Sequence, residues 1–306
     1  MNHKFDCLVS YHHNIYTCGV ARFNRYFADH LKVPMVSADQ VKANGFCSAL
    51  VSVKRSEMLD SDLSEFLSNL RGLSEYSIIL HDFSNSEFEI EILKNAARVM
   101  VLNDELAEEV QRIRDDVTVG FTVASYSYQP STSLPDLRLI TFGMAHKIQA
   151  KGYSRIGELL NQDRRSYVLE ISSALHEGTE FNDSFFMVGR EIADCFNGNV
   201  EFLGFLADVE VSRRIAQSSA MLAFFPKGAR ENNNSVMSAM NLGVPVITNL
   251  DGRSPKWLKH NDSVFDVSQL QSFPSAADLR RVGERGRDVV EHLTYDLLTE
   301  ILLRPR

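Results

Sequence analysis

The chain has 306 residues, of which 44% are hydrophobic and 24% charged, with 16 Gly and 8 Pro, and this composition excludes a disordered, collagen-like or disulfide-scaffold chain. A chain of this length is typical of two domains. Its 32 Lys and Arg residues against 40 Asp and Glu residues give a net charge of −8, so it lacks the general positive field that draws proteins to nucleic acid or anionic membranes. Nucleic-acid binding is therefore not indicated, although a local basic groove stays open.

The cysteines and the first residues bear on the compartment. Four cysteines with no CxxC pair fit neither a zinc-ligand pattern nor a secreted disulfide framework, and they predict free thiols in a reducing compartment. The apolar run at 7–10 soon meets Tyr11, His12 and His13, far short of a signal sequence or a membrane span. The sequence predicts a cytoplasmic protein without a membrane span.

Short apolar runs alternate with helical patterns in the first part of the chain, which is typical of parallel α/β architecture. A strand at 7–10 and a polar turn ending at Gly19 lead into a helix at 20–31. Further strands are expected at 49–53, 77–80 and 98–102, and helices at 61–70, 86–97 and 104–113. We expect residues 1–130 to form one domain.

A Ser, Thr and Pro-rich segment at 125–135 is the predicted linker, and the same alternation restarts after it. Strands are expected at 137–142, 167–172, 200–203, 221–225 and 245–248. Helices are expected at 155–160, 184–195, 209–218, 236–242 and 276–303. Residues 136–306 are the expected second domain. In parallel sheets ligands sit outside the carboxyl ends of the strands, so function is sought in the loops there.

The richest of these loops follows the strand at 221–225. It carries Lys227, Arg230, Glu231, Asn232, Asn233 and Asn234, and a helix then begins near Ser235 and ends at Gly243. A helix N-terminus flanked by cations and short polar side chains suits a phosphate or diphosphate. Asn234 or Ser235 could instead simply cap the helix.

The segment 235–248, SVMSAMNLGVPVIT, resembles the nucleotide-sugar segment of GT-B glycosyltransferases of family 4 (group 1), written E-G-x-G-x-x-x-x-E-A-M-A-x-G-x-P-V-I. When the AM and GVPVI stretches are aligned, the two glutamates of the motif fall on Arg230 and Ser238. In the family the first faces the donor sugar and the second usually holds the ribose. Glu231, one place along, could replace the first.

Three further segments carry the resemblance. CGVARF at 18–23 is similar to the glycine loop of the family, which implies that the backbone at Gly19 approaches the donor diphosphate. IILHD at 78–82 places His81 where a family histidine reaches the donor sugar, although such a histidine could also be structural. TFGMAHK at 141–147 followed by KG resembles a loop whose Arg and Lys grip the diphosphate; Met144 replaces the arginine, which leaves Lys147 or Lys151 as the cation.

The resemblance implies a GT-B fold, that is, two Rossmann-like parallel-sheet domains facing a cleft. Residues 1–130 would recognise the acceptor, and residues 136–306 would bind a nucleotide-sugar donor, with the terminal helix packing toward the first domain. It further implies retaining transfer without a metal or other cofactor, to an acceptor that the sequence does not identify. Lys147 and Arg230 would stabilise the leaving diphosphate and His81 would orient the sugar, so that replacing either cation by Ala lowers turnover and leaves folding intact.

Other readings stay open. A catalytically silent nucleotide-binding or partner subunit fits the loss of both motif glutamates, and a nucleotide-sugar epimerase would share the two-domain form. Asp60 and Asp62 form a nominal DxD metal motif, but they begin a helical pattern, where Asp and Ser are ordinary caps. The sequence lacks the GxSxG, P-loop and GxGxxG motifs of competing chemistries.

Overall fold

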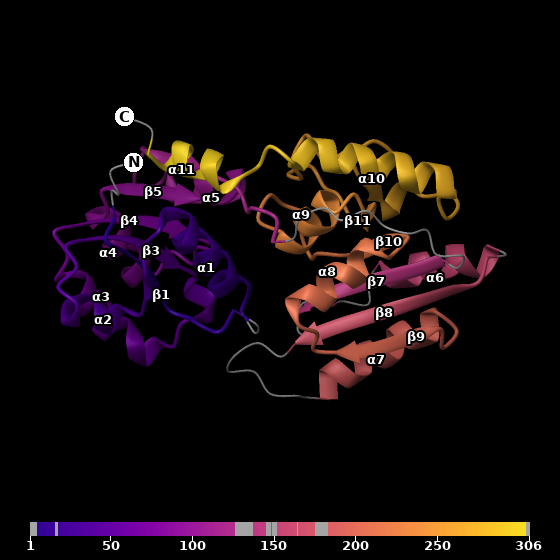
Figure 1. Cartoon of the computed structure of the whole chain (residues 1–306), viewed down its shortest axis with the longest axis horizontal. Helices are drawn as coiled ribbons and strands as arrows, with labels where there is room; N and C mark the ends of the chain where they lie inside the picture. The colour runs from indigo at the N-terminus through magenta and orange to yellow at the C-terminus, as the bar shows by residue number, and fades with distance from the viewer. Residues whose placement is uncertain are drawn as a thin grey trace. The chain divides into compact units, whose positions relative to one another are not determined.

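The computed structural model describes residues 5–15, 18–125, 137–144, 148, 152–163, 165–174 and 183–303. The chain divides into two compact units: unit 1 is Met1–Thr122 with Leu293–Arg306, and unit 2 is Val123–His292. Within the described residues each unit holds one six-stranded sheet, and every strand pair in both is parallel. The expectation of two Rossmann-like parallel-sheet domains is confirmed (Figure 1).

Unit 1 has the strand order β2-β1-β3-β4-β5-β6. Its strands are β1 Cys7–Ser10, β2 Met35–Val36, β3 Ser48–Val53, β4 Glu75–Leu80, β5 Arg98–Val101 and β6 Val117–Val119. Its helices are α1 Gly19–Leu31, α2 Ala38–Ala43, α3 Leu63–Leu70, α4 Glu87–Asn95, α5 Asp104–Val110 and α11 Tyr295–Leu303. Strands β1, β3 and β4 are buried almost throughout, as expected of sheet strands covered on both faces.

Unit 2 has the strand order β12-β11-β10-β7-β8-β9. Its strands are β7 Leu137–Met144, β8 Tyr167–Ala174, β9 Val200–Gly204, β10 Ala220–Ala223, β11 Val246–Thr248 and β12 Phe265–Asp266. Its helices are α6 Tyr153–Gln162, α7 Asp183–Cys195, α8 Asp208–Ala216, α9 Asn234–Asn241 and α10 Ala276–Val290. Counted from β7, this is the strand order of a dinucleotide-binding Rossmann sheet.

The elements absent from the sequence expectation are short. Strands β2, β6 and β12 have two or three residues and α2 has six. Elements of this length show too few repeats for a periodic pattern, and they form because a neighbouring strand or helix supplies their partners.

The helical tail expected at 276–303 is divided into two helices, α10 and α11. α11 belongs to unit 1: Leu298 and Leu302 are buried, and the Tyr295 ring stacks on Phe27 with centroids 5.5 Å apart. The Leu302 carbonyl oxygen also accepts a hydrogen bond from Arg98. The boundaries between the two units, at 122/123 and 292/293, thus differ from those of the expected domains 1–130 and 136–306. The difference at the second boundary arises because α11 packs on unit 1.

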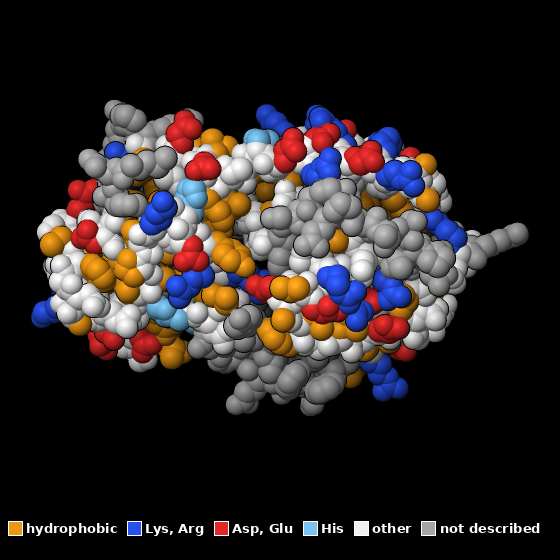
Figure 2. Space-filling model, viewed as in Figure 1, with side chains coloured by type: hydrophobic (Ala, Val, Ile, Leu, Met, Phe, Trp, Pro, Cys, Tyr) orange, Lys and Arg blue, Asp and Glu red, His pale blue; other side chains and the backbone are white. Residues whose placement is uncertain are grey.

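No described helix has the length and apolar character that crossing a lipid bilayer requires. On the face drawn in Figure 2, acidic and basic side chains of the described residues are interspersed over the surface. The four cysteines are free thiols, as expected.

Helix α10 packs closely against the turn between α9 and β11, and the contact is made at Gly283. A Cβ atom at Gly283 would lie 2.3 Å from the Gly243 carbonyl oxygen and 3.0 Å from Pro245 Cδ. We expect Gly283→Ala to lower the free energy of unfolding of unit 2 by about 1–3 kcal/mol, because overpacking a backbone contact forces the helix to shift. Urea unfolding followed by the fluorescence of Trp257, the sole tryptophan, measures this.

Gly189 in α7 is the matched control for this prediction. Among the described residues, a Cβ atom there meets Phe202 alone, at 3.4 Å, which is an ordinary contact. Gly189→Ala should therefore leave unit 2 equally or more stable, because alanine favours helix. Equal stability of the two variants would contradict the close packing of α10.

Candidate functional site

The loop that the sequence singles out lies at the point where the sheet of unit 2 changes direction. Strands β7 and β10 are neighbours in the sheet, and from them the strand order runs to opposite edges. In such sheets the loops leaving the carboxyl ends of these two strands frame the ligand crevice. Residues 224–233 leave β10 and lead into α9, and residues 145–152 leave β7.

Arg230 is buried in this loop and carries an ion pair. Its side chain is 8% exposed, and its guanidinium donates to both carboxylate oxygens of Asp251, at 2.9 and 2.8 Å. The Arg230 hydrogen bond holds the pKa of Asp251 below its ordinary value. The sequence predicts that Arg230→Ala leaves folding intact, but this contact gives a reason to expect lower stability, because the substitution removes a buried partner of Asp251.

The asparagines at the start of α9 hold the loop together. Asn233 Oδ1 accepts a hydrogen bond from the Arg230 amide at 2.6 Å, and the Asn233 amide donates to the Arg230 carbonyl oxygen at 3.1 Å. Asn234 donates to the Val123 carbonyl oxygen and accepts from Ser125 Oγ, both at 3.0 Å. These two side chains therefore fix the turn and tie the chain at 123–125 to α9.

Ser238 stands where the resemblance places the glutamate for the ribose. It is fully buried, and its Oγ accepts a hydrogen bond from the Ser125 amide at 3.1 Å. The same Oγ donates to Asn234 Oδ1 at 3.3 Å. In this chain the position serves the contact between α9 and residue 125.

Glu231, Asn232 and Ser235 are half-buried in the same turn, beside the N-terminus of α9. The first helical turn of any α-helix leaves backbone amides without intrahelical partners, and the helix dipole adds positive potential there. This end of α9 is the part of the described loop best suited to an anionic oxygen.

Lys147 and Lys151 lie outside the described residues, as do residues 126–136 of the expected linker. The residue after Lys151 is described: Gly152 has φ 103°, and a Cβ atom there would lie 2.6 Å from the Phe224 ring. Phe224 follows β10 directly, so the start of α6 lies against the strand that leads into the α9 loop.

In unit 1, His81 follows β4. Its Nε2 is 2.9 Å from Ser52 Oγ, and its ring meets the Phe23 ring edge-on with centroids 5.5 Å apart. Burial, helped by the Lys54 charge and opposed by Glu57, lowers the pKa of His81 to about 3. At neutral pH His81 is an uncharged group that can donate or accept a hydrogen bond, as its expected orienting role requires.

This shift makes a pH prediction. Because the folded-state pKa lies below the unfolded value of about 6.5, only the unfolded chain takes up a proton here as the pH falls. The contribution of His81 to stability is therefore complete above about pH 6.5 and is lost as the pH falls toward 3. We expect His81→Asn to flatten the decline in unfolding free energy between about pH 6.5 and 5, by at most about 1.4 kcal/mol per pH unit.

The measurement is urea unfolding followed by circular dichroism at several pH values. His292, an exposed histidine, provides the control through His292→Asn. A decline as steep in His81→Asn as in the parent protein would contradict the prediction.

Gly19 is the first residue of α1, and no atom of the described residues lies within 4 Å of where a Cβ atom would be. Within the described part of the chain, packing therefore does not require glycine here. Asp60 and Asp62, by contrast, are already engaged, Asp60 with Arg55 and Asp62 with the Tyr11 hydroxyl at 2.6 Å.

Two features of the structure were not predicted from the sequence: the ion pair of Asp251 with Arg230, and the group formed by His12, Cys18 and Glu57. His12 and Cys18 follow β1 and Glu57 follows β3. Each of these four residues lies in a segment that follows a parallel strand, and this position is a signal that the sequence offers. The sequence does not show which of these segments lie side by side, because that depends on the order of the strands in the sheet.

Neither a scan against protein-family models nor a search of curated proteins found a match. Solved structures do match. HepE of Anabaena, crystallised with UDP and glucose, aligns with a TM-score of 0.67 over 97% of both chains at 12% identity. Sucrose-phosphate synthase from Thermosynechococcus elongatus aligns with a TM-score of 0.62 over 85% of this chain and 74% of that one at 16% identity. A glycosyltransferase from Rickettsia africae ESF-5 aligns with a TM-score of 0.59 over 98% of both chains at 10% identity.

The protein has the GT-B fold. At these identities the likeness speaks for the fold, and it confirms the fold that the motifs led us to expect. In a GT-B protein the α9 loop belongs to the second Rossmann-like unit and His81 and Gly19 to the first.

Proposed function

We propose that this GT-B protein is a glycosyltransferase that moves a sugar from a nucleoside-diphosphate donor to an acceptor hydroxyl. The observation that carries the proposal is the polar turn and α9 N-terminus at the switch point of a Rossmann-ordered sheet. HepE, which shares the fold, was crystallised with UDP and glucose. Residues 1–130 would recognise the acceptor.

Charge is the difficulty of this reaction. The nucleoside diphosphate leaves as an anion while the sugar carbon gains positive charge, so preorganised donors aimed at the leaving phosphate lower the barrier. One such donor is typically worth about 3–4 kcal/mol. We assign this role to the α9 amides around Ser235, with Lys147 or Lys151 as the cation, and we assign Glu231 and Asn232 to the donor sugar.

The transfer would retain the configuration of the sugar and need no metal or cofactor, because a departing phosphate oxygen can take the acceptor proton. His81, held neutral by its surroundings, would orient the sugar through a hydrogen bond. Arg230 would act through the loop that it fixes.

Thermal unfolding with a panel of nucleoside diphosphates and their sugars tests the proposal. A ligand at about 100 times its dissociation constant stabilises the folded protein by about 2.7 kcal/mol, so one nucleotide should raise the melting temperature selectively. Slow donor hydrolysis in the same samples would then separate an enzyme from a binding protein. Absence of any shift across the panel at millimolar ligand would contradict the proposal.

Gly19 provides a sharper prediction. If a donor phosphate approaches its backbone, a methyl group there will collide with the ligand but with no described residue of the protein. We expect Gly19→Ala to weaken donor binding about tenfold or more while leaving the melting temperature without ligand unchanged or slightly higher. Isothermal titration with the selected nucleotide sugar measures this, and Gly189→Ala is the control. Equal affinity in the two variants would remove Gly19 from the donor site.

A catalytically silent partner subunit is the second candidate, and two contacts favour it. Both positions that align with the motif glutamates serve internal contacts: Arg230 binds Asp251, and Ser238 binds residue 125. A silent subunit would show no donor hydrolysis even where a nucleotide stabilises it.

A further inference from the structure

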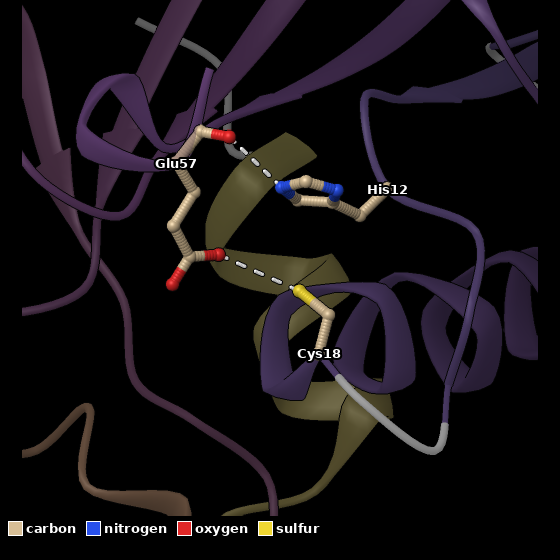
Figure 3. A group of neighbouring side chains, drawn as sticks. All are labelled: His12, Cys18 and Glu57. Carbon is tan, nitrogen blue, oxygen red and sulfur yellow. Dashed lines mark hydrogen bonds between the residues drawn. The ribbon is translucent and has the colours of Figure 1, made fainter. Parts of the chain in front are cut away.

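A histidine, a cysteine and a glutamate meet at the carboxyl edge of the sheet in unit 1. His12 follows β1, Cys18 precedes α1, and Glu57 ends the 3₁₀ turn Arg55–Glu57 after β3. Strands β1 and β3 are neighbours, and β2 lies on the other side of β1, so the group lies where the strand order of unit 1 changes direction. Figure 3 shows the three side chains converging from these separate segments.

The ligand-capable atoms of the group are close together. One ring nitrogen of His12, Cys18 Sγ and a Glu57 carboxylate oxygen all lie within 4.8 Å of one another. Cys18 Sγ lies 3.5 Å from Glu57 Oε2, and His12 Nε2 lies 2.9 Å from the Glu57 carbonyl oxygen. A sulfur and an oxygen bound to one tetrahedral Zn²⁺ at about 2.3 and 2.0 Å are also roughly 3.5 Å apart. The thiol and the carboxylate therefore already have the separation of two zinc ligands, and a His12 ring nitrogen lies within 4.8 Å of both.

The surroundings hold two of the ligands in place. Cys18 is 1% exposed, and its sulfur accepts a hydrogen bond from the Ala21 amide at the start of α1. The other carboxylate oxygen of Glu57 binds Lys54. Such outer contacts orient metal ligands and fix which oxygen faces the ion.

We propose that His12, Cys18 and Glu57 form a zinc site that clamps the start of α1 to the turn after β3. Imidazole, thiolate and carboxylate are the three ligand types that Zn²⁺ prefers, and three protein ligands leave a fourth position for water. On binding, the thiol proton passes to solvent, and the Nε2 contact to the Glu57 carbonyl oxygen gives way to a bond with the ion. Burial raises the pKa of the Cys18 thiol to about 11 in the metal-free protein, and a bound cation offsets that penalty. This site goes beyond the proposed function, in which transfer needs no metal.

Titration with Co²⁺, which replaces Zn²⁺ and absorbs light, tests the proposal on the reduced protein in a buffer that binds no metal. One equivalent should produce a thiolate-to-cobalt charge-transfer band, and one equivalent of Zn²⁺ should abolish it. Cys18→Ser should lose the band and weaken Zn²⁺ binding by at least the 10–100-fold that loss of even an outer-shell partner causes. Glu57→Gln should also weaken Zn²⁺ binding.

The variants keep the test falsifiable. Serine is a preferred N-cap residue, so Cys18→Ser should fold as well as the parent, as melting without metal will show. Cys47→Ser and Cys195→Ser, which replace cysteines outside the group, should keep the band. Absence of the band at one equivalent, or an equal band in Cys18→Ser, would overturn the proposal.

Discussion

Asp251→Ala will leave the buried Arg230 guanidinium without its carboxylate, and we expect the free energy of unfolding of unit 2 to fall by about 2–3 kcal/mol. Breaking a fully buried pair costs about 3–5 kcal/mol. The Asp251 side chain is 38% exposed, so water can partly replace it, and the expected cost lies below that range. Urea unfolding followed by Trp257 fluorescence reports on this unit directly.

The pair formed by Asp262 and Arg285 is the matched control for Asp251→Ala. It also lies in unit 2, but both side chains are about half exposed, at 45% and 53%. Asp262→Ala should therefore cost no more than about 1 kcal/mol. Similar small losses in both variants would mean that the Arg230 ion pair contributes little. Asp251→Asn, which keeps one acceptor oxygen, should fall between the two.

Lys147→Ala is expected to lower turnover about 100–1000-fold, because it removes a cation from the leaving diphosphate. Lys147 lies outside the described residues; in the sequence it comes three residues after β7, the strand next to β10. Initial rates with the nucleotide sugar selected by thermal unfolding measure the effect. Trp257 fluorescence should show unchanged folding.

Lys151→Ala measured in parallel decides which lysine carries the charge. Lys94→Ala is the control, since Lys94 is exposed in the last turn of α4, a helix that leads into the amino end of β5. A large loss confined to Lys151→Ala would transfer the assignment to that residue. Full turnover in both variants would refute cationic stabilisation by this loop.

Much of the fold was readable from the sequence because local patterns report burial. Buried strands such as β4, with the sequence EYSIIL, and amphipathic helices such as α1 carry periods that a single segment displays. Sequence also placed the α9 loop and His81 after strands. The short strands β2, β6 and β12 were not predicted, because they are too short to show a pattern and form by hydrogen bonding to a neighbouring strand.

The candidate site was only partly predictable. The sequence identified Arg230 as a cation near a helix N-terminus. It did not show that Arg230 forms an ion pair with Asp251, which is 21 residues away and follows the adjacent strand β11. Ser125 and Ser238, 113 residues apart, meet through a hydrogen bond that no local pattern announces. The sequence thus identified polar residues of the candidate site but not the residues with which they form contacts.

By itself the sequence determined two α/β halves, the order of their main elements and the polar loop that precedes α9, since each follows from which face of one short segment is buried. Tertiary structure alone decided three things: the return of α11 to unit 1, the pairing of Arg230 with Asp251, and the meeting of His12, Cys18 and Glu57. The last two depend on the order in which parallel strands pair, because that order selects which loops share an edge of the sheet. The first depends on contacts between residues far apart in the chain, such as Phe27 with Tyr295, which no single segment displays.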